Sequence, residues 1–253
     1  MSLYYVEDGP SDGVPVVLSG SIGSDHRMWE PQVKPLAARG FRVIRPDHPG
    51  HGKSPVPVGP CSIADVVEGL LGLLDDLGVA KAHLVGLSLG GMAGMWLGAH
   101  RPDRITSLTL CCTSAKLGPP ERWAERAATV LAEGTGAVAD AAVGRWVTPA
   151  YAERNPETVA MLRAMVAGTP AAGYAACCAA IEHMDLTGDL PRIAVPTLVI
   201  SGAEDPATPP DHGELIADGI PGARFEIVEG AAHLGSYEQH ERFTALILDR
   251  VGA

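Results

Sequence analysis

Short apolar runs alternate along the chain with longer stretches whose apolar residues recur at helical spacing. The runs are typical of buried strands and lie at 14–20, 41–47, 82–88, 105–112, 196–202 and 224–230. The stretch IADVVEGLLGLLDDLG (63–78) repeats apolar residues every three or four positions, which predicts an amphipathic helix. Strands that alternate with helices favour a mostly parallel central sheet covered by helices on both faces.

The alternation stops in the middle of the chain. From about Ala115 to Pro191 the sequence is rich in alanine, with helical segments such as PERWAERAATVLAEG and NPETVAMLRAMVAG, and it contains no convincing strand. Strands resume at Pro196. We therefore expect a helical cap over 116–190, inserted into a core formed by 1–115 and 191–253.

Length and charge narrow the classes of function. A chain of 253 residues is long enough to bury a full core without help from metals or disulfides. A formal net charge of -11 argues against nucleic acid or an anionic membrane as partner, because both would repel the protein. A small anionic substrate remains possible if the site supplies a local cation, and a homo-oligomer is also possible.

The cysteines and the N-terminal sequence point to a cytoplasmic protein. The cysteines are odd in number, lack C-x-x-C spacing and include two adjacent pairs in apolar surroundings; they are Cys61, Cys111, Cys112, Cys177 and Cys178. This pattern predicts buried, reduced thiols. The start MSLYYVEDGP has no basic segment followed by an apolar run, and no stretch reaches transmembrane length.

A G-x-S-x-G motif, Gly86-Leu87-Ser88-Leu89-Gly90, follows an apolar run and opens a helical stretch. A sharp turn from strand to helix makes a serine hydroxyl project, and small residues on either side let neighbouring backbone pass. By itself the motif is weak evidence for a catalytic serine, but its place between a predicted strand and a predicted helix makes Ser88 a candidate nucleophile.

A serine nucleophile needs a base, and the base needs a third group that fixes its tautomer. Asp205 lies just beyond the run PTLVISG, in a proline-rich loop, and His233 lies a few residues beyond the next run. The chain order Ser, Asp, His is that of α/β-hydrolases. Glu204 is the competing acid, and Asp205 is preferred because the acid is expected at this turn.

The other histidines have simpler interpretations. His83 is expected to pack within a strand, His51 to belong to a Gly/Pro turn, and His26 to fix a loop or face solvent, although it could line a pocket. The rest show no metal-ligand spacing: His48, His100, His183, His212 and His240. We expect neither a metal site nor a cofactor.

The loop within VVLSGSIGSDHRMW (16–29) could be a plain turn, a phosphate cradle or a site where backbone N–H groups face an anion. It lacks the Lys and Ser/Thr of a P-loop and is not a G-x-G-x-x-G fingerprint, which excludes nucleotide binding. Acyl transfer needs two N–H donors for the developing oxyanion. One is expected from Leu89, after the nucleophile, and the other from the loop between Gly20 and Gly23.

Taken together, these residues resemble the α/β-hydrolase superfamily over nearly the whole chain, through G-L-S-L-G-G, PDHPGHGKS, Asp205 and His233. Within it, LSGSIGSDHRMWEPQ, RWVTP, AGYAACCAAI and LPRIAVPTLVISGAEDPATPP are similar to 3-oxoadipate enol-lactonases, which also have Ser, here Ser19, where most relatives have His. The chain departs from that subfamily at His48-Pro49-Gly50 and at HLGSYE, and it begins at what resembles the family's second strand, which leaves the strand number open.

The resemblance implies an α/β-hydrolase fold with a helical cap, and a cofactor-free serine hydrolase that opens an enol-lactone in aromatic catabolism. It implies Ser21 as the second oxyanion donor. A carboxylate-bearing lactone would need a cation, and we single out Arg145 with Trp146 as pocket wall, beside Arg122, Trp123 and Arg126. The same scaffold also serves general carboxylesterases, C–C hydrolases, cofactor-free haloperoxidases and triad-containing small-molecule receptors.

Overall fold

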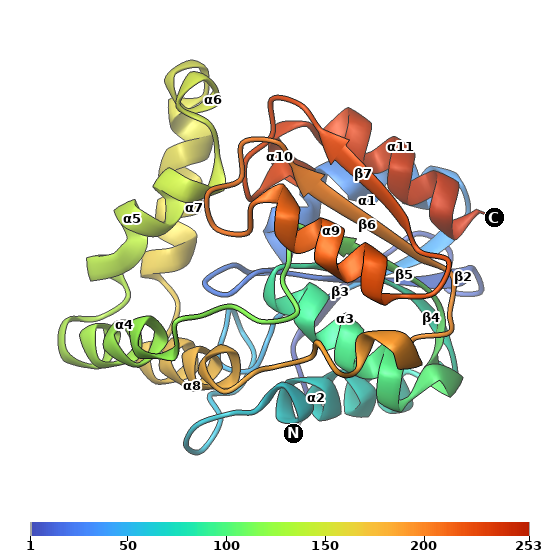
Figure 1. Cartoon of the computed structure of the whole chain (residues 1–253), viewed down its shortest axis with the longest axis horizontal. Coiled ribbons are helices and arrows are strands. Elements are labelled where there is room, and N and C mark those ends of the chain that lie inside the picture. Colours follow the sequence, from blue (N-terminus) through green and yellow to red (C-terminus); the bar gives the residue numbers. More distant parts are fainter. Residues whose placement is uncertain (1, 253) are drawn as a thin grey trace.

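The computed structural model describes residues 2–252, which form a seven-stranded sheet with helices around it (Figure 1). The strands lie in the order β1-β3-β2-β4-β5-β6-β7, and only β1 runs antiparallel to its neighbour. Their bounds are β1 Tyr5–Asp8, β2 Val14–Ser19, β3 Phe41–Pro46, β4 Ala82–Leu87, β5 Ile105–Cys111, β6 Thr197–Gly202 and β7 Arg224–Val228. The predicted parallel sheet is confirmed.

Strand β1 is the element that the apolar pattern missed. Its sequence, YVED, is short and half-buried, and it pairs with β3 from Tyr5↔Pro46 to Asp8↔Val43. An edge strand with one face partly open to solvent needs no continuous apolar run, so its hydrophobic signal is weak.

Helices cover both faces of the sheet (Figure 1). Around the sheet lie α1 Glu30–Ala38, α2 Ile63–Asp76, α3 Leu89–His100, α9 Pro210–Gly219, α10 Gly235–Glu238 and α11 His240–Val251. Helix α1 packs with α11, and α2 packs with α3. Helix α2 begins where predicted because Ser62 and Asp65 form a capping box: Ser62 Oγ accepts from the Asp65 N–H at 3.2 Å, and Asp65 Oδ2 accepts from the Ser62 N–H at 2.8 Å.

Five further helices gather beyond one end of the sheet, in the yellow-green to orange part of Figure 1. They are α4 Pro120–Glu133, α5 Gly136–Trp146, α6 Pro149–Arg154, α7 Pro156–Ala167 and α8 Ala171–Glu182. Within 116–190 the structure has no strand, as the sequence predicted. We call these five helices the cap; the boundaries 115/116 and 190/191 of the two domains stay a prediction.

Hydrogen bonds between backbones join the cap to the rest of the chain. The Cys61 N–H donates to Ala176 O at 3.1 Å, and the Leu234 N–H donates to Trp146 O at 2.7 Å. All five cysteines are buried and unpaired. Among residues 2–252 no single helix has both the length and the hydropathy needed to cross a membrane. Helices α7 and α8 have the required length and hydropathy only when they are counted together, and the chain bends by 89° between them.

Candidate active site

Ser88 occupies a strained turn between β4 and α3. Its backbone has φ 55° and ψ -113°, a region that residues with a Cβ rarely adopt. The flanking glycines are required by close approach: a Cβ on Gly86 would lie 2.2 Å from Gly90 O, and one on Gly90 would lie 2.3 Å from Ser19 O. The strand-to-helix turn that the motif predicted is therefore present.

The loops after β6 and β7 bring Asp205 and His233 together. His233 Nδ1 lies 2.8 Å from Asp205 Oδ2, and both residues are buried. Thr208 Oγ1 donates to the same oxygen at 2.7 Å, while the N–H groups of Ala207 and Thr208 donate to Oδ1 at 2.8 and 3.0 Å. Glu204, the competing acid, is exposed.

These contacts determine the ionisation of Asp205 and which nitrogen of the neutral His233 ring carries the hydrogen. Burial by itself would raise the pKa of Asp205, but the charge and hydrogen bond of His233 and the hydrogen bonds of Thr208 outweigh it and hold that pKa below its ordinary value. An ionised carboxylate can only accept, so His233 Nδ1 carries the hydrogen and Nε2 is left as the basic atom.

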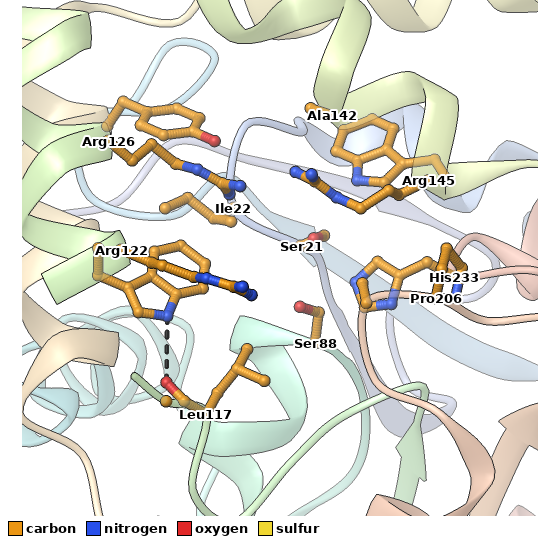
Figure 2. Close-up of a pocket in the computed structure, with 15 residues that line it drawn as sticks. Ser21, Ile22, Ser88, Leu117, Arg122, Arg126, Ala142, Arg145, Pro206 and His233 are labelled. Atoms are coloured by element: carbon orange, nitrogen blue, oxygen red, sulfur yellow. Dashed lines mark hydrogen bonds between the residues drawn. The ribbon is translucent and has the colours of Figure 1, made fainter. Parts of the chain in front are cut away.

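The hydroxyl of Ser88 and the ring of His233 line one pocket (Figure 2). The hydrogen bonds of the described residues include none between the two side chains. Such bonds commonly tighten only once substrate is bound. The arrangement places a potential nucleophile and a potential base on the same cavity.

Hydrogen bonds to the Gly20 carbonyl fix the loop after β2. Gly20 O accepts from the Gly90 N–H at 2.9 Å and from His48 Nε2 at 2.8 Å. Because a peptide group is planar, fixing this carbonyl also fixes the direction of the Ser21 N–H. That N–H donates to Met28 Sδ at 3.2 Å, a weak acceptor. Leu89 is the first residue of α3, where an N–H has no acceptor within its own helix.

His48 is the residue at this loop that sequence reasoning undervalued. It is buried, and burial lowers its pKa against the opposing effects of its bond to Gly20 and the charge of Asp47. A neutral ring that donates from Nε2 to a carbonyl is the form this contact requires. Its only signal in the sequence is the departure at His48-Pro49-Gly50.

The pocket has a volume of about 360 Å³ and lies between the sheet and the cap. All five cap residues singled out from the sequence line it. The complete lining is Ser21, Ile22, Ser88, Leu117, Gly118, Arg122, Trp123, Arg126, Ala142, Arg145, Trp146, Tyr174, Pro206, Ala207 and His233.

Three guanidinium groups face this pocket, Arg122 and Arg126 from α4 and Arg145 from α5 (Figure 2). None of them forms an ion pair with a carboxylate within residues 2–252. Burial, then the charges of Arg126 and Arg122, lowers the pKa of Arg145, with Tyr174 opposing. Arg126 also lies 4.8 Å above the Trp123 ring. The pocket is therefore a concentrated positive site in an acidic protein.

Sequence reasoning missed Tyr174 and Glu238. Tyr174 is buried and lines the pocket, and its sequence signal is that it interrupts the small residues of AGYAACCAAI. Glu238, the last residue of HLGSYE, is buried between the cap and the His233 loop. It accepts from the N–H and hydroxyl of Thr148 and, at 2.9 Å, from the N–H of Ala232. This carboxylate ties the segment after Trp146 to the loop that carries the histidine.

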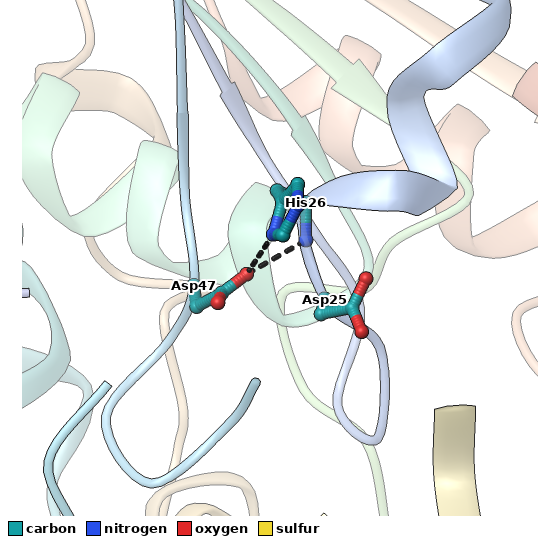
Figure 3. A group of neighbouring side chains, drawn as sticks. All are labelled: Asp25, His26 and Asp47. Atoms are coloured by element: carbon teal, nitrogen blue, oxygen red, sulfur yellow. Dashed lines mark hydrogen bonds and ion pairs between the residues drawn. The ribbon is translucent and has the colours of Figure 1, made fainter. Parts of the chain in front are cut away.

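Asp25, His26 and Asp47 form a cluster with the composition of a metal site (Figure 3), their potential ligand atoms lying within 4.8 Å of one another. The oxygens already have partners from the chain. Asp47 Oδ1 accepts from the His26 N–H at 2.7 Å, Asp47 Oδ2 from the Lys53 N–H at 2.9 Å, and Asp25 from Arg27. The cluster fixes a loop, the role expected of His26.

The remaining histidines considered as bases lie elsewhere. His83 is buried in β4 with Nδ1 2.7 Å from Ser107 Oγ, as expected of a packed strand residue. His51 is buried in its turn, with Nδ1 3.0 Å from Pro49 O. Neither residue lines the pocket, which leaves His233 as its only histidine among the described residues.

The fold and this arrangement define an α/β hydrolase. The chain belongs to the α/β hydrolase fold family, whose sequence model matches residues 14–239. The fold class inferred from the sequence is thereby confirmed.

Particular relatives are similar over almost the whole chain. A 3-oxoadipate enol-lactonase of Acinetobacter baylyi is 36% identical over 243 residues, covering 96% of this chain and 90% of the relative. The crystal structure of the enol-lactonase from Burkholderia xenovorans superposes with a TM-score of 0.97 at 42% identity, covering 99% of this chain and 96% of the other. A malate-bound thermophilic esterase from Thermogutta terrifontis has a TM-score of 0.92 at 34% identity, covering 98% and 92%.

Proposed function

We propose that the protein is a serine hydrolase that opens a small enol-lactone bearing a carboxylate. The observation that carries the proposal is one pocket shared by the Ser88 hydroxyl, the His233 ring and three arginines that have no carboxylate partner within residues 2–252. The similarity to two enol-lactonases supports the substrate class, and a relative that binds malate, a dicarboxylate, supports an anionic ligand. The reaction would belong to aromatic catabolism, as the resemblance implied, and the buried, unpaired cysteines are consistent with the cytoplasm.

In the proposed mechanism, Ser88 Oγ attacks the lactone carbonyl while His233 Nε2 takes its proton. Asp205 holds the ring in the required tautomer and stabilises the imidazolium. The N–H groups of Ser21 and Leu89 hold the oxyanion, and each such donor lowers the barrier by about 3 kcal/mol. The Ser21 N–H would exchange its weak Met28 acceptor for the charged oxygen.

Collapse of the tetrahedral intermediate breaks the bond between the carbonyl carbon and the ring oxygen. The ring oxygen leaves as an enolate, which takes up the proton that His233 removed from Ser88 and becomes a ketone by protonation on carbon, so His233 is neutral again. Because an enolate is a good leaving group, this step needs little acid catalysis. Water activated by His233 then attacks the acyl ester, releases the second carboxylate and returns the proton to Ser88.

The cap supplies recognition in this proposal. Arg145 would bind the substrate carboxylate, with Arg122 and Arg126 adding positive potential, and Trp146 would form an apolar wall. A compact cavity of about 360 Å³ suits a small lactone.

The test is a hydrolysis panel of the 3-oxoadipate enol-lactone, a simple neutral lactone and p-nitrophenyl esters. Wild type is compared with Ser88→Ala and with Ser11→Ala, an exposed serine as control. Ser88→Ala should lower kcat/KM by at least about 10⁴-fold and Ser11→Ala should leave it unchanged. No turnover of any compound, or turnover that survives in Ser88→Ala, contradicts the proposal; preference for the neutral esters would favour a general carboxylesterase.

A further inference from the structure

The side-chain hydroxyl of Ser21 has no hydrogen-bond partner among the described residues, although its residue is only 1% exposed. Other buried side-chain atoms of residues 2–252 share this condition, such as Thr109 Oγ1 and His51 Nε2. Ser21 is the one among them whose residue lines the pocket of Ser88 and His233. The neighbouring hydroxyl of Ser24, by contrast, donates to Ser21 O at 2.7 Å.

An unpaired buried hydroxyl is unfavourable, because it loses water without gaining a partner. Alanine at this position would avoid that cost with nearly the same shape. Figure 2 shows the Ser21 hydroxyl beside the space that the hydroxyl of Ser88 and the ring of His233 also face. A polar atom kept unpaired at such a place points to a partner that is part of the reaction.

The main-chain donor of the same residue sharpens this expectation. The Ser21 N–H already contacts Met28 Sδ at 3.2 Å, whereas the hydroxyl is uncommitted and can rotate toward a new acceptor. The Gly20 carbonyl is held by two donors, so the loop that presents both Ser21 donors is fixed before any ligand binds.

We infer that Ser21 Oγ is a further catalytic residue, which donates a hydrogen bond to the substrate oxygen that becomes the oxyanion when Ser88 attacks. The inference rests on the proposed function and adds a third donor beside the N–H groups of Ser21 and Leu89. The proton stays on Ser21 Oγ throughout, and no bond to this residue forms or breaks. The ligand class is a lactone or ester in its tetrahedral form.

The experiment compares wild type, Ser21→Ala, Ser21→Thr and the control Thr109→Val, which removes another buried, unpartnered hydroxyl outside the pocket. Ser21→Ala should lower kcat by roughly 10- to 100-fold with KM little changed, because the hydrogen bond forms fully only in the transition state. Ser21→Thr, which keeps the hydroxyl, should have a kcat much closer to that of wild type. Thr109→Val should have the same kcat and KM as wild type.

Three further measurements separate catalysis from folding. The melting temperature of Ser21→Ala should equal or exceed that of wild type, because an unpaired hydroxyl is removed. Phenylboronic acid, whose adduct with Ser88 mimics the tetrahedral intermediate, should bind more weakly to Ser21→Ala by about the same factor as kcat falls. The carboxylate product should bind with unchanged affinity.

The outcomes separate the inference from the proposed function. An active wild type whose kcat and boronate affinity are unchanged in Ser21→Ala overturns the role of this hydroxyl alone. An equal loss in Thr109→Val also overturns it, by showing a general structural effect. A wild type that hydrolyses no lactone or ester overturns the proposed function and this inference with it.

Discussion

The two walls of the pocket differ in how their charged and carbonyl groups are paired. On the sheet side, the Asp205 carboxylate accepts hydrogen bonds from three residues and Gly20 O accepts two. On the cap side, three guanidinium groups face the cavity without a carboxylate partner among the described residues.

This difference in pairing corresponds to two different functions of the polar groups in the pocket. Groups that must act on a reacting carbonyl need fixed geometry, which a saturated hydrogen-bond network provides. Groups that select a charged substrate need available charge, which an internal ion pair would cancel. Under the proposed function, the sheet side therefore governs kcat and the cap side governs KM and the choice of substrate.

After Ser88→Ala, the largest expected effect comes from a second substitution on the sheet side, Asp205→Asn. The amide no longer enforces the tautomer that leaves His233 Nε2 basic, so kcat should fall by about 10³- to 10⁴-fold with little change in KM. Steady-state kinetics on the enol-lactone measure it. Glu204→Gln, at the exposed neighbour, is the matched control and should behave as wild type; a greater loss in that variant would show that the wrong acid was chosen.

Arg145→Ala should affect the other parameter. It removes a charge-assisted hydrogen bond to the substrate carboxylate, so KM for the anionic lactone should rise about 10- to 100-fold while KM for a neutral ester hardly changes. Arg154→Ala, on an exposed arginine of α6 outside the pocket, serves as control. Equal effects on both substrates would remove Arg145 from substrate recognition.

The smallest expected effect is on stability, and it concerns the contact between the sheet side and the cap side. There the ring of His51 stacks on that of Tyr174 in α8, with ring centroids 6.3 Å apart. Burial, with a smaller effect of His48, lowers the pKa of His51 to about 4, against 6.5 for an ordinary histidine. Between pH 4 and pH 6.5 the His51 side chain binds a proton in the unfolded chain but not in the folded chain. The free energy of unfolding is therefore undiminished by this residue above pH 6.5, and it decreases as the pH falls toward 4.

From pH 7.5 to pH 5 this histidine should remove about 2 kcal/mol from the free energy of unfolding. Urea unfolding at the two pH values measures the loss. In His51→Asn, the change in the free energy of unfolding between the two pH values should be smaller by that amount. In His183→Asn, which replaces an exposed histidine, this change should equal that of wild type. An identical pH dependence in His51→Asn and wild type would show that this ring does not titrate as its burial implies.

Much of the sheet side could be predicted from the sequence because its signals are local. The motif around Ser88 specifies its own turn, since Gly86 and Gly90 are required by contacts within a few residues and by the adjacent strand. Strands with continuous apolar runs were found, whereas β1, a half-buried edge strand, was not. The candidate acid and base followed from their positions after successive strands.

Other features depend on contacts between distant segments. His48 reaches Gly20 across 28 residues, and Glu238 reaches Thr148 across 90. No spacing rule connects such positions, so their partners emerge only when the sheet and cap assemble. For the acid, which the sequence analysis assigned to Asp205, the structure adds a physical reason: Asp205 is buried against His233, whereas the adjacent Glu204 is exposed.

The layered α/β architecture, the helical insertion and the candidate nucleophile, acid and base could be predicted from the sequence, because periodicity, turn chemistry and chain order act over short distances. The folded structure was needed to show that, within the described range 2–252, three cap arginines converge without carboxylate partners and the Ser21 hydroxyl is left unpaired beside Ser88. Whether a polar group is paired is decided by neighbours that chain folding brings from elsewhere in the molecule.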